Sequence, residues 1–317
     1  MSGRIMLILP YFGSLPAWFP YFAKSLEGSP ILDAHLFTDA KFTGRRPANL
    51  IIHPFSLEQF NLLASAKLSS AVHITSPYKL CDFRPAYAAI FSDFLADYEY
   101  WAFGDLDLAY GNLGGFLGPL LGQYDVISNR QGWISGSLCV LRNCQTVNSL
   151  FRQTDAWKQV FSSPDNMLFD ELGGFLYPEV MRGEDICNLK GQVESFTYIV
   201  KAAAREGTVR CFFNDLACED IAWGETLKYE GGRITRQDKS EVMYVHYVVM
   251  RRRFFAVPRV SVAPDQFYIR KTGIYLSEPQ IASICTREFS RVIVGALAGA
   301  GRLFRRWDVS LAGGEPH

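Results

Sequence analysis

The chain has 317 residues, of which 49% are hydrophobic and 14% aromatic, enough to bury the core of one large domain or two small ones. Lysine plus arginine and aspartate plus glutamate both total 32, so the overall charge does not favour nucleic acid as a partner, and any phosphate binding must be local. The seven cysteines are odd in number and form no C-x-x-C pair, which predicts reduced thiols of a cytosolic protein and argues against a zinc site or a disulfide framework.

The first part of the chain alternates strand and helix patterns. Residues 5–9 form a short apolar run, which predicts a first strand rather than a signal peptide. Residues 15–26 carry apolar side chains at helical spacing with Pro16 in the first turn. Two more strands are predicted over residues 34–38 and 50–53, and Ser56 is a typical cap for a helix that runs to about residue 67. Such alternation is typical of a βαβ sheet.

Residues 82–98 have the clearest helical periodicity in the sequence. The apolar stripe consists of Tyr87, Ile90, Phe91, Phe94, Leu95 and Tyr98. Asp82 stands where an N-cap belongs, and Pro85 falls in the first turn. The pattern predicts one long helix over residues 82–98.

Beyond this helix the pattern predicts strands over residues 124–128 and 137–141, with a short helix over residues 113–121 before them. No linker is evident before about residue 260. We therefore predict an α/β fold with a mixed, mostly parallel sheet flanked by helices. The predicted division is a domain over residues 1–260 and a C-terminal extension over residues 261–317.

Two carboxylates one residue apart follow a short apolar run. Residues 100–104 are bulky and largely aromatic, which indicates a strand buried on both faces, and Asp105 and Asp107 come directly after it. Ligands bind at the carboxyl ends of strands in open α/β sheets. The two side chains can turn toward one divalent cation that keeps positions free for substrate phosphates. The alternative is a pair that only caps a turn, and the flanking Gly104 and Gly111 favour the site.

Three other groups of residues are expected at the same edge of the sheet. They are Tyr11, Phe12 and Gly13 after the first strand, Thr38 and Asp39 after the second, and Lys79, Asp82 and Arg84 at the start of the long helix. Arg84 at a helix N-terminus suits a phosphate ligand, because the helix dipole, the guanidinium and a bridging cation all favour negative charge. The alternative for Lys79, Asp82 and Arg84 is a solvated capping cluster.

Segments 79–87 and 104–111 resemble bacterial glycosyltransferases of the A-type fold. The likeness is closest to an uncharacterised bacterial group related to the retaining families that carry Asp-x-x-Arg before Asp-x-Asp. Segments 10–13, 37–39, 134–136 and 169–171 fit the same group. The resemblance covers about residues 4–255 and is strongest over residues 78–143. The sequence departs from it at residues 97–99, where Asp-Tyr-Glu replaces the usual Gly-Gly.

The resemblance implies a metal-dependent enzyme that moves a sugar from a nucleotide-sugar donor, UDP- or GDP-linked, to a glycan or lipid-linked acceptor. It implies that Mn²⁺ or Mg²⁺ is held by Asp105, Asp107 and a late histidine, His246. The implied donor-binding residues are Tyr11, Phe12, Gly13, Thr38, Asp39, Lys79, Asp82, Arg84, Asp105, Leu106, Ser135, Gly136 and Arg251. The implied catalytic residues are Arg84, Asp170 and Glu171, with Asp170 and Glu171 on the acceptor side. Retention of anomeric configuration is favoured by this analogy alone.

Other interpretations remain open. His246 can instead be a strand histidine packed among aromatic side chains. A metal-dependent phosphohydrolase also uses Asp-x-Asp, although it normally needs more ligands nearby, and the five histidines are scattered. A catalytically inactive protein that binds a nucleotide or a carbohydrate is the third alternative.

The segment from Ile281 to Trp307 predicts an amphipathic basic helix. Apolar side chains fall on one side of it and arginines on the other, a pattern typical of a membrane-surface anchor. The alternative is docking on the catalytic domain or on a second subunit, which makes an oligomer. The anchor predicts a cytoplasmic protein that is peripheral on the inner face of the cytoplasmic membrane. The resemblance to bacterial glycosyltransferases implies a role in bacterial surface polysaccharide synthesis.

Overall fold

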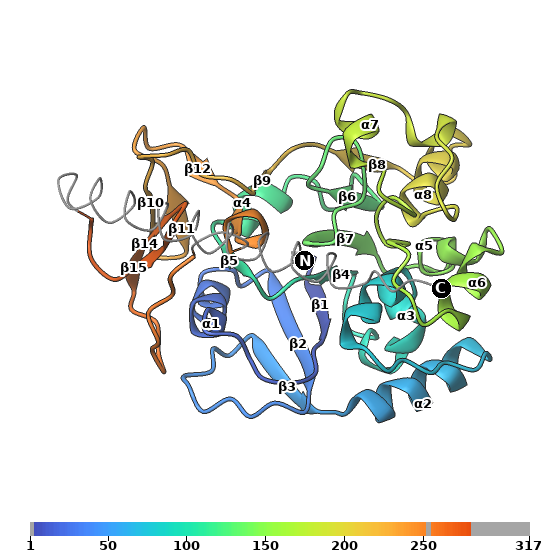
Figure 1. The fold of residues 1–317 in the computed structure, drawn as a ribbon, viewed down its shortest axis with the longest axis horizontal. Coiled ribbons are helices and arrows are strands. Elements are labelled where there is room, and N and C mark those ends of the chain that lie inside the picture. Colours follow the sequence, from blue (N-terminus) through green and yellow to red (C-terminus); the bar gives the residue numbers. More distant parts are fainter. Residues whose placement is uncertain (1–2, 252–254, 280–317) are drawn as a thin grey trace, which may run out of the picture.

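The computed structural model describes residues 3–251 and 255–279 of the chain, and its centre is a seven-stranded sheet (Figure 1). The strand order is β3-β2-β1-β4-β7-β6-β8. The strands are β1 (Ile5–Pro10), β2 (Leu32–Thr38), β3 (Leu50–Pro54), β4 (Tyr100–Gly104), β6 (Val126–Ser128), β7 (Leu138–Arg142) and β8 (Cys211–Phe213). Strand β7 is antiparallel to β4 and β6, and the other pairings in this sheet are parallel. The predicted mixed, mostly parallel sheet is confirmed.

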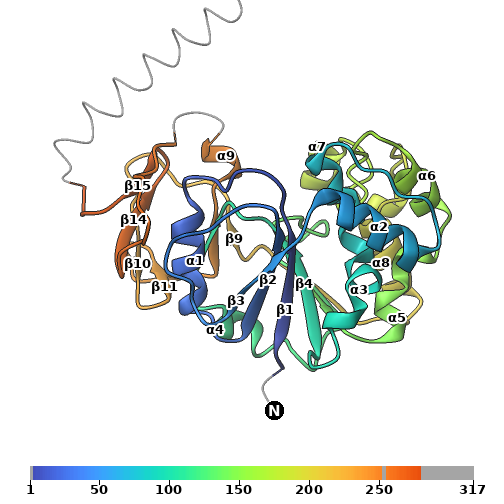
Figure 2. The same ribbon diagram turned by 90° about the horizontal axis from the view of Figure 1, so that it is seen from below.

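Helices cover both faces of this sheet (Figure 2). Side chains alternate along a strand, so Met6 and Ile8 of β1 enter one apolar cluster and Ile5 and Leu7 enter another. The first cluster includes residues of α2 (Leu57–Leu68), α3 (Tyr87–Ile90), α5 (Gln145–Asn148), α6 (Ala156–Ser162) and α8 (Phe196–Arg205). The second includes residues of α1 (Phe19–Glu27) and α4 (Leu113–Leu117).

Two of the predicted helices differ from the observed ones at their ends. Helix α1 begins at Phe19 rather than at residue 15, so Pro16 precedes it and Pro20 occupies the first turn. Helix α4 ends at Leu117, four residues before the predicted end at 121. The predicted cap of α2 is confirmed, because the Ser56 hydroxyl accepts the backbone N–H of Gln59, whose side chain binds Ser56 in return.

The predicted helix over residues 82–98 is wrong. The chain instead forms the 3₁₀ helix η1 (Pro77–Ala86), the single α-turn of α3 and the 3₁₀ helix η2 (Ser92–Phe94). Asp82 is no N-cap: it is fully buried, and its carboxylate accepts the backbone N–H groups of Met167 and Phe169, each at 2.8 Å. These long-range hydrogen bonds hold Asp82 in a 3₁₀ helix, whereas the spacing of the apolar residues had indicated an α-helix.

Two smaller sheets complete the described structure. One has the order β5-β13-β9, with β5 (Leu108–Tyr110), β13 (Tyr244–His246) and β9 (Ala217–Cys218). The other has the order β12-β11-β10-β14-β15, with β12 (Glu241–Val242), β11 (Arg233–Thr235), β10 (Leu227–Glu230), β14 (Gln266–Arg270) and β15 (Gly273–Tyr275). It packs on α1, where the rings of Tyr21 and Phe267 lie 5.1 Å apart. Strands β14 and β15 lie beyond residue 260, where the extension was expected to begin, and β14 pairs with β10.

The remaining elements are the short helices η3 (Leu150–Arg152), α7 (Tyr177–Met181), η4 (Ile186–Asn188) and α9 (Val248–Arg251). No helix within the described ranges has both the length and the apolar character needed to cross a bilayer. The predicted amphipathic helix from Ile281 to Trp307 lies outside the described residues.

Candidate metal and donor site

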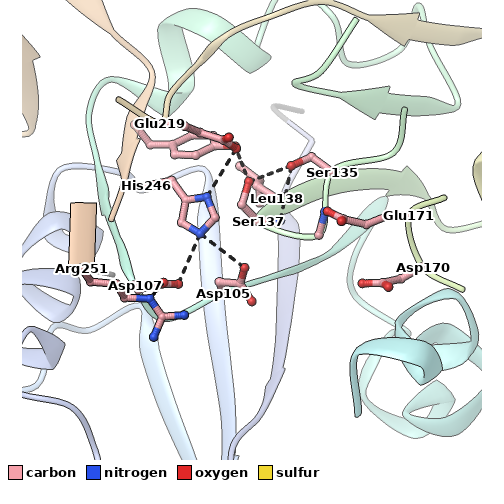
Figure 3. Close-up of polar contacts among 12 residues, drawn as sticks. Asp105, Asp107, Ser135, Ser137, Leu138, Asp170, Glu171, Glu219, His246 and Arg251 are labelled. Atoms are coloured by element: carbon pink, nitrogen blue, oxygen red, sulfur yellow. Dashed lines mark hydrogen bonds and ion pairs between the residues drawn. The ribbon is translucent and has the colours of Figure 1, made fainter. Parts of the chain in front are cut away.

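Residues far apart in the chain meet at the end of the small three-stranded sheet. Asp105 and Asp107 lie between β4 and β5, and the antiparallel pairing of β13 with β5 sets His246 opposite Leu108. His246 Nε2 lies 3.4 Å from Asp107 Oδ1 and 3.6 Å from Asp105 Oδ2 (Figure 3). One ligand atom from each of the three residues lies within 4.8 Å of the others, so this group could hold a metal ion.

The chemistry of this group fits a divalent cation. His246 Nε2 is buried and, among the described residues, has no hydrogen-bond partner, although two carboxylates face it. A cation that binds one nitrogen and two oxygens would satisfy it. Burial raises the pKa of Asp107, but His246 and Arg251 outweigh it and the net pKa is lowered. The carboxylate is therefore ionised, as a metal ligand must be.

Arg84 is buried between two carboxylates. One terminal nitrogen pairs with Asp105, and the other lies 2.8 Å from Asp170 Oδ2. Burial alone would lower the pKa of Arg84, but the neighbouring Asp105 and Asp170 raise it above its ordinary value. Burial also raises the pKa of Asp170. Arg84 acts to lower this pKa and Glu171 to raise it, and the net pKa lies above its ordinary value. The guanidinium thus links the candidate metal ligands to the predicted acceptor side.

The turn at Gly136 holds Glu171 in place. The Gly136 N–H donates to Glu171 Oε1 at 2.6 Å, and the Tyr177 hydroxyl donates to Oε2. A Cβ atom at Gly136 would lie 2.4 Å from the nearer Arg84 terminal nitrogen, so only glycine fits here without a shift. The Ser135 hydroxyl is buried and 2.8 Å from that of Ser137.

A pocket of about 330 Å³ lies beside Asp105 and Asp107. The predicted residues that line it are Tyr11, Phe12, Arg84, Asp105, Leu106, Asp107 and Arg251. Arg251 Nε lies 2.8 Å from Asp107 Oδ2, and its guanidinium lies over the Trp18 ring, 5.7 Å from the centroid. Guanidinium groups and aromatic rings therefore share this pocket.

In the described structure, the remaining predicted residues do not line this pocket. They are Gly13, Thr38, Asp39, Lys79, Asp82, Ser135, Gly136, Asp170, Glu171 and His246. Asp39 is exposed and accepts the Gly13 N–H at 2.8 Å. Lys79 pairs with Asp82 at 2.8 Å, and both are buried, so the alternative of a solvated capping cluster is wrong for these two.

Comparison with known proteins places the chain in a family. Residues 7–278 match the family of unknown function DUF6625. The chain belongs to this family. No curated protein matches the DUF6625 chain.

Two solved structures are remotely similar to this DUF6625 protein. One is the galactosyltransferase LgtC in complex with donor and acceptor sugar analogues, at 7% identity and a TM-score of 0.29. That match covers 49% of this chain and 64% of the other, so the chain spans less than two thirds of LgtC. The other is mouse xyloside xylosyltransferase 1 in its apo form, at 9% identity, a TM-score of 0.35, and 78% and 97% coverage. At these TM-scores neither similarity supports a shared activity.

Several residues of the DUF6625 site have no signal in the sequence. Glu219 lies behind His246, and no motif marks it. The Tyr177 ring packs in T-shaped arrangements with the Trp133 and Phe175 rings, whose centroids lie 5.8 and 5.6 Å away. Phe175 is 77% exposed, and this high exposure of a large aromatic ring is evident only in the fold.

Proposed function

We propose that this DUF6625 protein is a metal-dependent glycosyltransferase that moves a sugar from a nucleotide-sugar donor, UDP- or GDP-linked, to a glycan or lipid-linked acceptor. The observation that carries the proposal is the buried Nε2 of His246, which faces Asp105 and Asp107 and, within the described chain, has no hydrogen-bond partner. The neighbouring pocket adds Arg84 and Arg251. A cation site with two guanidinium groups beside aromatic walls suits a diphosphate that carries a base and a sugar.

The proposed mechanism follows from where charge develops. Cleavage of the bond between the anomeric carbon and the diphosphate leaves negative charge on a phosphate oxygen. Mn²⁺ or Mg²⁺ held by Asp105, Asp107 and His246 would supply positive charge to that oxygen. Arg84 uses two of its five N–H groups on Asp105 and Asp170, so it retains donors for phosphate oxygens from a buried position. The chain thus needs no nucleophile of its own to assist departure.

The acceptor is proposed to bind beyond Arg84, next to Asp170 and Glu171. Both Glu171 oxygens accept hydrogen bonds, from Gly136 and Tyr177, which fixes the carboxylate. A fixed carboxylate can steady positive charge at the anomeric carbon or orient an acceptor hydroxyl. The exposed Phe175 ring packs against Tyr177, whose hydroxyl donates to Glu171, and it offers an apolar face on which a sugar ring can lie. Retention of configuration stays a proposal based on resemblance, to be checked from the anomer of the product.

The proposal extends to a cytoplasmic location, at the inner membrane face, and to a role in bacterial surface polysaccharide synthesis. The location rests on the basic amphipathic pattern of residues 281–307, and the role rests on the resemblance of the sequence to bacterial glycosyltransferases. Flotation with anionic liposomes tests it: the full chain should float and a chain ending near residue 278 should not. Equal behaviour of the two would favour docking on protein or a second subunit.

The decisive experiment measures nucleoside diphosphate release by the full chain from UDP-glucose, UDP-galactose and GDP-mannose, with and without Mn²⁺. Release should require Mn²⁺ and should be lost in Asp107→Asn. The matched control is Asp155→Asn, because the Asp155 side chain is 87% exposed and pairs with Lys158 on the surface. Release of inorganic phosphate would indicate the phosphohydrolase alternative. Donor binding without turnover would indicate the inactive binding protein.

A further inference from the structure

We propose that Glu219 is a positioning residue that orients the His246 imidazole for metal binding, and that Arg130 holds Glu219 in turn. This inference rests on the metal site of the proposed function. Glu219 lies outside every motif used to predict that site, and it touches neither the Asp-x-Asp carboxylates nor the donor pocket in the described structure.

Strand register places Glu219 beside His246. Strand β9 pairs in parallel with β13, and Cys218 is opposite Val245. The next residues, Glu219 and His246, therefore leave the two strands side by side. In Figure 3 Glu219 lies on the side of the imidazole that faces away from Asp105 and Asp107. The small sheet thus sets a carboxylate on each side of the ring.

The two imidazole nitrogens have different partners. Nδ1 lies 3.4 Å from Glu219 Oε1, while Nε2 faces Asp105 and Asp107. A carboxylate acceptor at Nδ1 selects the tautomer that carries its proton there, a choice assigned from these contacts. That tautomer leaves the Nε2 lone pair free for a cation. The His246 side chain is only 7% exposed, so water has little access to replace Glu219.

Arg130 fixes Glu219 from behind. One terminal nitrogen of Arg130 pairs with Glu219 Oε2, so each Glu219 oxygen has its own partner. The other terminal nitrogen lies 3.5 Å from Asp215, and the guanidinium lies over the Trp133 ring, 5.3 Å from the centroid. Because Arg130 follows β6, this pair ties the main sheet to the ligand histidine of the small one.

The test uses Mn²⁺ alone and the full chain, with the free-ion signal in electron paramagnetic resonance as the measure of binding. Glu219→Ala should weaken Mn²⁺ binding about 10- to 100-fold, the usual loss for an outer partner of a metal-bound histidine. Glu219→Gln should lose less, because its amide oxygen still accepts the Nδ1 proton. Asp215→Asn is the matched control: it removes the negative charge 3.5 Å from Arg130 but leaves the contacts of His246 untouched, so binding should stay near wild type.

A spectroscopic readout separates orientation from general structure. Pulsed resonance should show coupling of Mn²⁺ to an imidazole nitrogen in the wild type, weaker coupling in Glu219→Ala, and partial rescue in Glu219→Gln. Unchanged affinity and coupling in Glu219→Ala would overturn the role of Glu219 while leaving the metal site standing. Equal losses in Asp215→Asn would also overturn it. A wild-type chain that binds no Mn²⁺ would overturn both this role and the proposed metal site.

Discussion

Adding one methyl group at Gly136 should displace Arg84 without removing any charge. The alanine Cβ would lie 2.4 Å from an Arg84 terminal nitrogen and 3.0 Å from Glu171 Oε1. Contacts below 3.4 Å are already tight, so the guanidinium must retreat by about 1 Å. A misplacement of this size at a reacting centre costs about 10²-fold in rate, or about 2.7 kcal/mol. The assay is kcat/KM for nucleoside diphosphate release with the donor that the wild type uses.

The matched control is Gly114→Ala in α4, where the new Cβ would meet no described atom outside its own helix within 4 Å. This variant should keep full activity, and its helix should gain about 0.5–1 kcal/mol because alanine favours the helical state over glycine. A Gly136→Ala protein with a wild-type melting temperature and a kcat/KM within twofold of wild type would refute the reasoning that catalysis requires the observed position of the Arg84 guanidinium.

Two further outcomes concern the aromatic wall and a buried histidine. Phe175→Ala should lower transfer to methyl pyranoside acceptors but not donor hydrolysis. The exposed control Leu62→Ala should change neither reaction. Parallel loss of both reactions in Phe175→Ala would contradict a role of Phe175 in acceptor binding. Burial lowers the pKa of His35 from 6.5 to about 4. Between these two pH values the unfolded chain binds more protons than the folded chain. The free energy of unfolding should therefore fall by about 1–2 kcal/mol as the pH drops through this range. Urea titrations at pH 7 and pH 4.5 should show a smaller drop for His35→Gln but not for the exposed control His73→Gln; an unchanged drop in His35→Gln would count against the prediction.

Local patterns were sufficient for the strands that carry the site. The apolar run over residues 100–104 is buried as β4, and two carboxylates follow it directly, because a strand buried on both faces leaves a signature in consecutive residues. The helix over residues 82–98 failed for the opposite reason. Asp82 resembled a local cap, but its carboxylate binds backbone groups of Met167 and Phe169, more than 80 residues away.

The site itself was only partly open to prediction. Asp105, Asp107 and Arg84 lie close together in sequence, and the fold brings them into contact or onto one pocket. Glu219 and Phe175 could not be found in this way. Glu219 matters through the register of β9 on β13, and Phe175 through its exposure beside Tyr177, and both depend on the fold rather than on sequence spacing.

The three-stranded sheet β5-β13-β9 also determines when the chain can first hold an ion. The pairing of β13 with β5 brings His246 to Asp105 and Asp107. A partly folded chain in which β13 has not yet docked therefore presents the two carboxylates without the histidine. A cation that binds the native state alone adds about 2.7 kcal/mol of stability at a concentration 100 times its dissociation constant. Bound metal would then stabilise the docking of β13 on β5, and chelation would weaken that pairing.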